Sequence, residues 1–116
     1  MKFQLLLFIL GRKIKGRVKN DPDFKKKAAE KNCTVQIKTA DNSRGRSYTF
    51  NNGDVISKKG VTANPNVALS FKDAATGFDV LKSGKTMDAL KDGSLKLEGD
   101  AALALWFSGI AKGAAQ

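Results

Sequence analysis

Side chains that commonly carry catalysis are scarce in this chain. It contains no histidine, the most frequent general base and metal ligand in proteins, and a single cysteine, Cys33. A lone cysteine can form neither an intramolecular disulfide nor a cysteine-cluster zinc site, and it is compatible with a reducing compartment. Because no histidine is present to activate it, we expect Cys33 to be a half-buried structural thiol at the start of a strand.

The carboxylates also favour structure over catalysis. Eight acidic residues follow residue 31, and they are scattered through predicted turns and helix caps. Asp54, Asp92 and Asp100 stand where turns and N-caps favour aspartate. The serines lack a nucleophile-elbow context, and Gly93 and Gly99 match neither a phosphate loop nor a dinucleotide fingerprint. The sequence therefore predicts no enzyme, no catalytic residue, no metal site and no cofactor.

Positive charge is concentrated near the N-terminus. The chain has 21 Lys and Arg against 11 Asp and Glu, a formal net charge of +10. Residues 1–31 hold ten of the basic and three of the acidic side chains, which gives this segment +7. Three interpretations are open: a solvated helix surface, attachment to anionic lipid, and nucleic-acid binding. We expect no nucleic-acid partner, because the aromatic–glycine pattern of a common RNA-binding sheet is absent.

The same N-terminal segment has the spacing of an amphipathic helix. Its apolar face consists of Phe3, Leu6, Leu7, Leu10, Ile14 and Val18. The basic residues predicted to contact a membrane or another anion are Arg12, Lys13, Lys15, Arg17 and Lys19. The apolar run at 3–10 is far shorter than the roughly 20 residues that span a bilayer. A signal peptide is the rival interpretation, but basic residues follow the run directly and no cleavage pattern is seen. We expect a cytoplasmic protein, with peripheral membrane contact left open.

The remaining pattern predicts an α+β fold. Asp21 and Pro22 are typical of the N-cap and first position of a short second helix. Alternating apolar residues predict five strands, over 34–39, 44–50, 55–58, 67–71 and 95–97. Short helices are predicted around 74–81 and 87–91, and a terminal helix follows the cap Asp100. This order predicts a mixed, mostly antiparallel sheet covered on one face by helices, in one compact domain.

The terminal helix is unusual because it carries no charge until Lys112. An ordinary surface helix has one apolar stripe and one polar face. Here one face is marked by Leu103, Trp106, Phe107 and Ile110, and another by Ala102, Leu105 and Gly109. Such a helix is expected to be buried in the core, pressed against a partner, or lining an apolar ligand cavity. Phe78, Leu81 and Met87 on the preceding helices are candidate co-liners.

The segment Asp92–Asp100 together with the apolar helix after it resembles the sterol carrier protein family, small lipid-transfer domains that bind sterols and fatty acyl chains. The segments 53–55 and 65–71 add to the resemblance, which covers roughly Thr34 to Gly113. It implies a five-stranded sheet with an apolar tunnel under its helices. It also implies binding or transfer of a lipid-like molecule without chemistry. Residues 32–116 would then be the lipid-binding domain, and 1–31 a basic helical segment.

The predicted cavity wall follows from helix periodicity. It consists of Phe78, Leu81, Met87, Leu90, Leu103, Trp106, Phe107 and Ile110. Two alternatives stay open at this point. One is an interaction protein that docks its apolar helices on a partner or on its own copy. The other is an accessory protein that delivers a hydrophobic intermediate, such as a quinone precursor or a steroid, to a partner enzyme.

Overall fold

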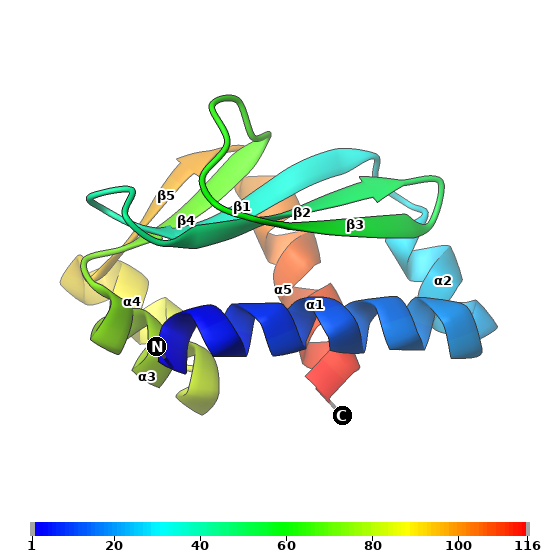
Figure 1. Cartoon of the computed structure of the whole chain (residues 1–116), viewed down its shortest axis with the longest axis horizontal. Helices are drawn as coiled ribbons and strands as arrows, with labels where there is room; N and C mark the ends of the chain where they lie inside the picture. The colour runs from blue at the N-terminus through cyan, green and yellow to red at the C-terminus, as the bar shows by residue number, and fades with distance from the viewer. Residues whose placement is uncertain (1, 116) are drawn as a thin grey trace.

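A computed structural model describes residues 2–115 of the chain. The described residues form helices and strands in the predicted order (Figure 1). Their bounds are α1 Lys2–Asn20, α2 Pro22–Ala28, β1 Cys33–Thr39, β2 Gly45–Asn51, β3 Asp54–Lys59, β4 Val67–Phe71, α3 Ala74–Ser83, α4 Thr86–Asp92, β5 Leu95–Gly99 and α5 Ala101–Ala115. None of the described helices combines the length and the hydropathy needed to cross a membrane.

The strands form one mixed sheet in the order β3-β2-β1-β4-β5. β1 pairs with β4 in parallel, and the other neighbouring pairs are antiparallel. Val35 in the centre of β1 is in register with Tyr48 on one side and with Val67 on the other. The helices lie on one side of this sheet (Figure 1). The predicted α+β architecture is therefore confirmed.

Side-chain alternation along the strands separates the two faces of the sheet. Cys33, Val35 and Ile37 belong to the buried hydrophobic core, and Cys33 is only 6% exposed, so this thiol is more buried than predicted. The turn between β2 and β3 has the predicted chemistry, because Asn52 and Gly53 both have positive φ. A two-residue hairpin turn of this kind requires that backbone geometry.

Helix α1 is part of the core. Phe3, Leu7, Ile14 and Val18 are buried, as their spacing predicted. The buried Tyr48 of β2 donates a hydrogen bond of 2.7 Å to the carbonyl oxygen of Leu7. Helix α1 lies close to the sheet at Gly11, where a Cβ atom would lie 2.6 Å from a side-chain oxygen of β3. The helix therefore crosses β2 and β3 in direct contact.

The acidic residues at element ends act as caps. Asp21 accepts hydrogen bonds from the backbone nitrogens of Asp23 and Phe24 at the start of α2. Asp100 accepts from the backbone nitrogens of the second and third residues of α5, at 2.9 and 3.3 Å. Asp92 accepts from the backbone and hydroxyl of Ser94 in the turn before β5. These carboxylates have the structural roles expected from the sequence.

Candidate functional site

Helix α5 packs one face against the centre of the sheet. Phe107 and Ile110 are each 2% exposed, and both belong to the main hydrophobic core. The ring of Phe107 lies 5.5 Å from that of Tyr48 and 6.0 Å from that of Phe50, centroid to centroid. These two predicted ligand-lining residues therefore fill the interior between α5 and the sheet.

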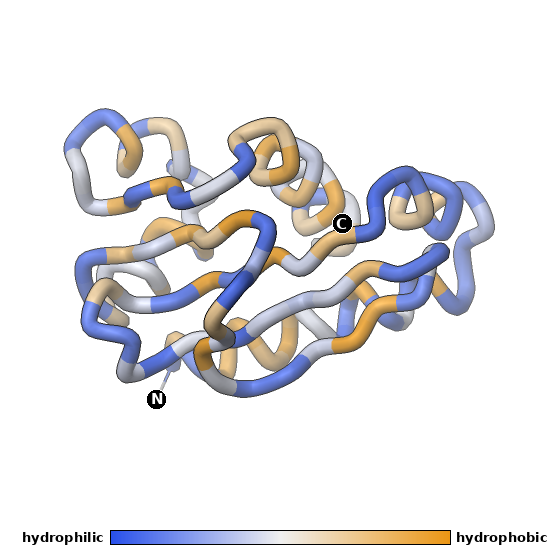
Figure 2. Tube along the Cα trace, turned by 90° about the horizontal axis from the view of Figure 1, so that it is seen from above, coloured by the Kyte–Doolittle hydropathy of each residue, from blue (hydrophilic) through white to orange (hydrophobic). Residues whose placement is uncertain are grey.

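Trp106 faces the neighbouring helix α2. Its indole lies edge-on to Phe50 at 4.8 Å, and its Nε1 donates a hydrogen bond of 3.2 Å to the carbonyl oxygen of Lys27. Farther along the same side, a Cβ atom on Gly113 would lie 3.2 Å from the ring of Phe24. In Figure 2, α2 is mostly hydrophilic in colour and α5 mostly apolar or intermediate. Trp106 thus joins α5 to α2, on the side away from α3 and α4.

The outward face of α5 is exposed although it carries no charge before Lys112. Leu105 is 77% exposed, and the other residues of this face are small: Ala101, Ala102, Ser108 and Gly109. The sequence predicted a helix with almost nothing for water on any side. The structure shows that such a helix nevertheless leaves one uncharged face open.

Helix α4 is weakly attached to the rest of the fold. Of its seven residues only Ala89 is buried, and its N-cap makes no side-chain hydrogen bond. Gly84 and Gly93, with φ of 75° and 85°, flank the helix. Met87 is 65% exposed and Leu90 38%. A short helix with one buried side chain has little packing to hold it in place.

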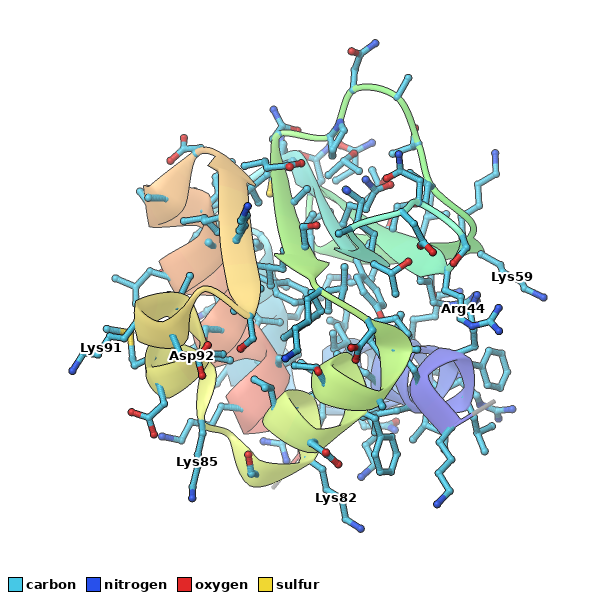
Figure 3. The ribbon with its side chains drawn as sticks, turned by 90° about the vertical axis from the view of Figure 1, so that its left-hand side faces the viewer. Arg44, Lys59, Lys82, Lys85, Lys91 and Asp92 are labelled. Atoms are coloured by element: carbon cyan, nitrogen blue, oxygen red, sulfur yellow. The ribbon has the colours of Figure 1, made fainter. Side chains whose placement is uncertain are left out.

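Met87 and Leu90 on α4 and Leu105 on α5 are the exposed large apolar residues of these two helices, and we call them the α4–α5 apolar surface. Both helices contact β5. Phe78 and Leu81 on α3 and Leu103 on α5 are half-buried and pack against the core. Lys82, Lys85 and Lys91 point outward around α3 and α4 (Figure 3).

The shifted pKa values described for residues 2–115 have local physical causes. Burial, and secondarily the charge of Asp100, raises the pKa of Cys33, which keeps the thiol protonated. Burial also raises the pKa of Tyr48 well above its usual value. Hydrogen bonds from Ser43 lower the pKa of Asp41 to about 2. Residues 2–115 contain no cluster of three or more His, Cys, Asp or Glu side chains placed to hold a metal ion.

The fold has helices on one face of a five-stranded mixed sheet, and the uncharged α5 follows a strand, a turn and a cap. A comparison of the sequence with protein families gives a result that agrees with this arrangement. Residues 12–112 match the model described as the SCP-2 sterol transfer family. This match covers most of the chain. The chain belongs to the SCP-2 sterol transfer family. None of the curated proteins matches it.

Several solved structures share the fold of this SCP-2 family member. One, named "UbiJ-SCP2 Ubiquinone synthesis protein", has a TM-score of 0.68 at 12% identity, covering 95% of this chain and 91% of that one. A crystal structure of sterol carrier protein 2 has a TM-score of 0.65 at 16% identity, covering 91% and 93%. A solution structure of palmitated SCP2L2 from Aedes aegypti has a TM-score of 0.52 at 25% identity, covering 88% and 90%.

In this SCP-2 family member the predicted site residues differ in their surroundings. Phe107 and Ile110 are core, Trp106 faces α2, and Met87 and Leu90 are exposed. Two hollows are present elsewhere, of about 520 Å³ and about 330 Å³. The larger is lined by Lys15, Val18, Lys19, Pro22, Lys25, Asp54 and Val55. The predicted cavity-wall residues line neither hollow.

The predicted anion-contacting residues of α1 differ in their surroundings. Arg12, Lys13, Lys15 and Lys19 are exposed. Arg17 instead forms an ion pair of 3.2 Å with Asp21 and lies over the ring of Phe24. Sequence reasoning missed the exposed apolar residues of the same helix: Leu5 at 58%, Phe8 at 43% and Ile9 at 39%. The unbroken apolar run at 5–10 is the signal for them, because it occupies both faces of a helix.

Proposed function

We propose that this member of the SCP-2 sterol transfer family binds and transfers a hydrophobic, lipid-like ligand without catalysing a reaction. The ligand would be a fatty acyl chain or a sterol, and the protein would act in the cytoplasm. The observation that supports this most is the α4–α5 apolar surface on the helical side of the sheet, with Leu105 at 77% exposure. Covering apolar surface contributes about 25 cal/mol per Å². A ligand bound this way would be selected loosely among long-chain molecules.

We propose that the ligand enters between α4 and α5 and moves α4 outward. Helix α4 suits such a movement, because Ala89 is its one buried residue, its large apolar side chains are exposed, and glycines flank it. The opened space would be lined by the cavity wall expected from the sequence: Phe78, Leu81, Met87, Leu90, Leu103, Trp106, Phe107 and Ile110. The lysines that point outward around α3 and α4 (Figure 3) would attract the carboxylate of a fatty acid that remains at the surface.

A peripheral contact with an anionic membrane is proposed for α1. Its exposed side combines Leu5, Phe8 and Ile9 with cationic residues, and Arg12 and Arg46 lie over the Phe8 ring at 5.9 and 5.2 Å. Basic amphipathic helices bind anionic bilayers through this combination of apolar area and charge. Because the buried side of α1 belongs to the common core, we propose that residues 1–31 and 32–116 act as one unit.

An accessory role is the second candidate. The uncharged outward face of α5 would also suit a partner protein, to which a bound hydrophobic molecule could be delivered. The similarity to a structure named as a ubiquinone synthesis protein makes an isoprenoid or quinone precursor a reasonable ligand to include in tests. Native mass spectrometry of the freshly purified protein would identify a co-purifying lipid and separate the two candidates.

Titration with a fluorescent fatty acid tests the binding proposal. We expect saturable binding that weakens when Leu105→Gln places an amide on the α4–α5 apolar surface. The matched control is Ile56→Gln, because Ile56 is an apolar residue of β3 that is 59% exposed. It lies on the opposite face of the sheet and should leave affinity unchanged. Absence of saturable binding for fatty acids, sterols and isoprenoids alike would overturn the proposal.

A further inference from the structure

The sheet face opposite the helices carries a second, polar hollow of about 330 Å³. Three of its residues, Thr34, Ser47 and Thr49, project from β1 and β2 on that face. Ser47 is in register with Gln36 on one side and with Lys58 on the other. The loop 60–66 rises above this face (Figure 1). Residues of β3 and of this loop supply the rest of the lining. The lining residues are Thr34, Ser47, Thr49, Ile56, Lys58, Lys59, Gly60, Val61, Thr62 and Asn64.

The loop is held over the sheet by hydrogen bonds along its length. The nitrogen of Gly60 donates to the carbonyl oxygen of Gly45 at 2.9 Å, and that of Asn66 donates to Thr34 at 2.9 Å. Between them, the nitrogen of Thr62 donates to the side-chain oxygen of Gln36. Because both ends and the middle of the loop are fixed, the hollow is a built feature rather than a gap beside a loose segment.

Ser47 is the residue whose surroundings point to a ligand. The residue is 6% exposed, and its hydroxyl makes no hydrogen bond to protein within the part of the chain that the structure describes. The comparable buried serine on this face, Ser70, accepts a hydrogen bond of 3.4 Å from Lys38. Thr34 and Thr49 bond to each other at 3.1 Å. The Ser47 oxygen is not among the side-chain atoms that are buried without a partner, so it reaches the solvent of the hollow that it lines. A hydroxyl in this position is a donor available to a bound group.

The charge of the hollow selects an anion. Lys58 lies directly across from Ser47, where cross-strand side chains are about 5 Å apart. Lys59 is at the rim and extends into solvent (Figure 3). The lining residues include no carboxylate. Hydroxyl donors beside a lysine ammonium suit a group with several acceptor oxygens, since lysine binds phosphate as a point charge.

We propose that this hollow binds the phosphoryl group of a small phosphorylated molecule. Ser47 Oγ donates a hydrogen bond to the phosphoryl oxygens, Thr49 adds a second hydroxyl, and Lys58 Nζ neutralises their charge. The volume lies at the lower end of the range for small-molecule sites. The hollow is on the opposite side of the sheet from the proposed lipid site, so this inference does not depend on lipid binding.

The experiment is an NMR titration of the ¹⁵N-labelled full chain with three probes: inorganic phosphate, glycerol 3-phosphate, and phosphatidylglycerol vesicles. We expect saturable shifts of the Ser47, Thr49 and Thr62 amides with the two soluble probes, beyond those caused by potassium chloride at equal ionic strength. Binding restricted to vesicles would contradict a small-molecule site. The absence of saturable shifts with any probe would also overturn the proposal.

Matched variants test the assigned side chains. Ser47→Ala and Lys58→Gln should each weaken binding about tenfold. Lys96→Gln removes the same charge from β5, outside the hollow, and should leave affinity unchanged. Ser47→Ala should fold with undiminished thermal stability, because the Ser47 hydroxyl has no protein partner. Lys58→Gln should also fold, because Lys58 is exposed. At least one of the two variants therefore remains measurable. Unaltered affinity in both, or equal loss in Lys96→Gln, would refute the site. Both variants should retain fatty-acid binding.

Discussion

Two glycines on α1 meet opposite surroundings, and substituting each with alanine gives a matched test of how this helix is placed. A Cβ atom on Gly11 would lie 2.6 Å from Ser57 Oγ, 3.0 Å from Ser57 Cβ and 3.2 Å from Tyr48 Cε1. Ser57 cannot turn away without cost, because its hydroxyl accepts a hydrogen bond of 2.8 Å from Arg46 Nε. A Cβ atom on Gly16 would contact nothing within 4 Å.

The expected effects differ in sign. Alanine is more favourable than glycine inside a helix by about 1 kcal/mol. Gly16→Ala should gain most of this, which raises the melting temperature of a chain of this size by about 4 °C. At Gly11 the same gain is opposed by overpacking, which costs about 1–3 kcal/mol. Gly11→Ala should therefore be less stable than the unmodified chain by about 1 kcal/mol.

Urea unfolding followed by circular dichroism measures both changes. Both substitutions change intrinsic helix propensity in the same way. The difference in unfolding free energy between Gly11→Ala and Gly16→Ala therefore reports the contact between α1 and the sheet. Equal stabilisation by the two substitutions would refute the reasoning, because it would mean that α1 does not lie on Tyr48 and Ser57.

Three further outcomes follow from the structure. Tyr48→Phe removes the hydrogen bond to the Leu7 carbonyl and should cost about 1 kcal/mol of unfolding free energy in urea; no loss would contradict that contact. Hydrogen bonds from Ser43 lower the folded-state pKa of Asp41 to about 2 from its ordinary value of 3.8, so the stabilising effect is present above pH 3.8 and is lost as the pH falls toward 2. Asp41→Asn should reduce the fall in melting temperature between pH 3.8 and pH 2, and an unchanged fall would contradict the hydrogen bonds of this turn. Because burial raises the pKa of Cys33, a thiol reagent should react far more slowly with the folded chain than in urea, and equal rates would show that the thiol is accessible.

Local chemistry made most of the fold predictable. The pair Asp21-Pro22, the turn Asn52-Gly53 and the cap Asp100 each act through neighbouring backbone groups, so their roles can be seen in the sequence. The strand order could not be predicted in the same way. The parallel pairing of β1 with β4 joins segments more than 30 residues apart and depends on packing of the whole sheet.

The candidate sites were less predictable. On α5 the residues are apolar all round, so periodicity could not tell which face meets the sheet. Trp106 and Leu105 are neighbours in sequence, yet one binds α2 and the other is open to water. The polar hollow brings together Thr34, Ser47 and Lys58 from three strands. No spacing within a single segment reveals such a grouping.

The central claim is that a lipid-like ligand binds between α4 and α5, and a photoactivatable fatty acid tests it most directly. After irradiation of the complex, mass spectrometry of peptides locates the cross-linked residues. The account predicts labels on Met87 and Leu90 of α4 and on α5 around Leu105. Labels confined to the opposite sheet face around Ile56 would contradict it. Labelling that is equal with and without an excess of unlabelled fatty acid would also contradict it.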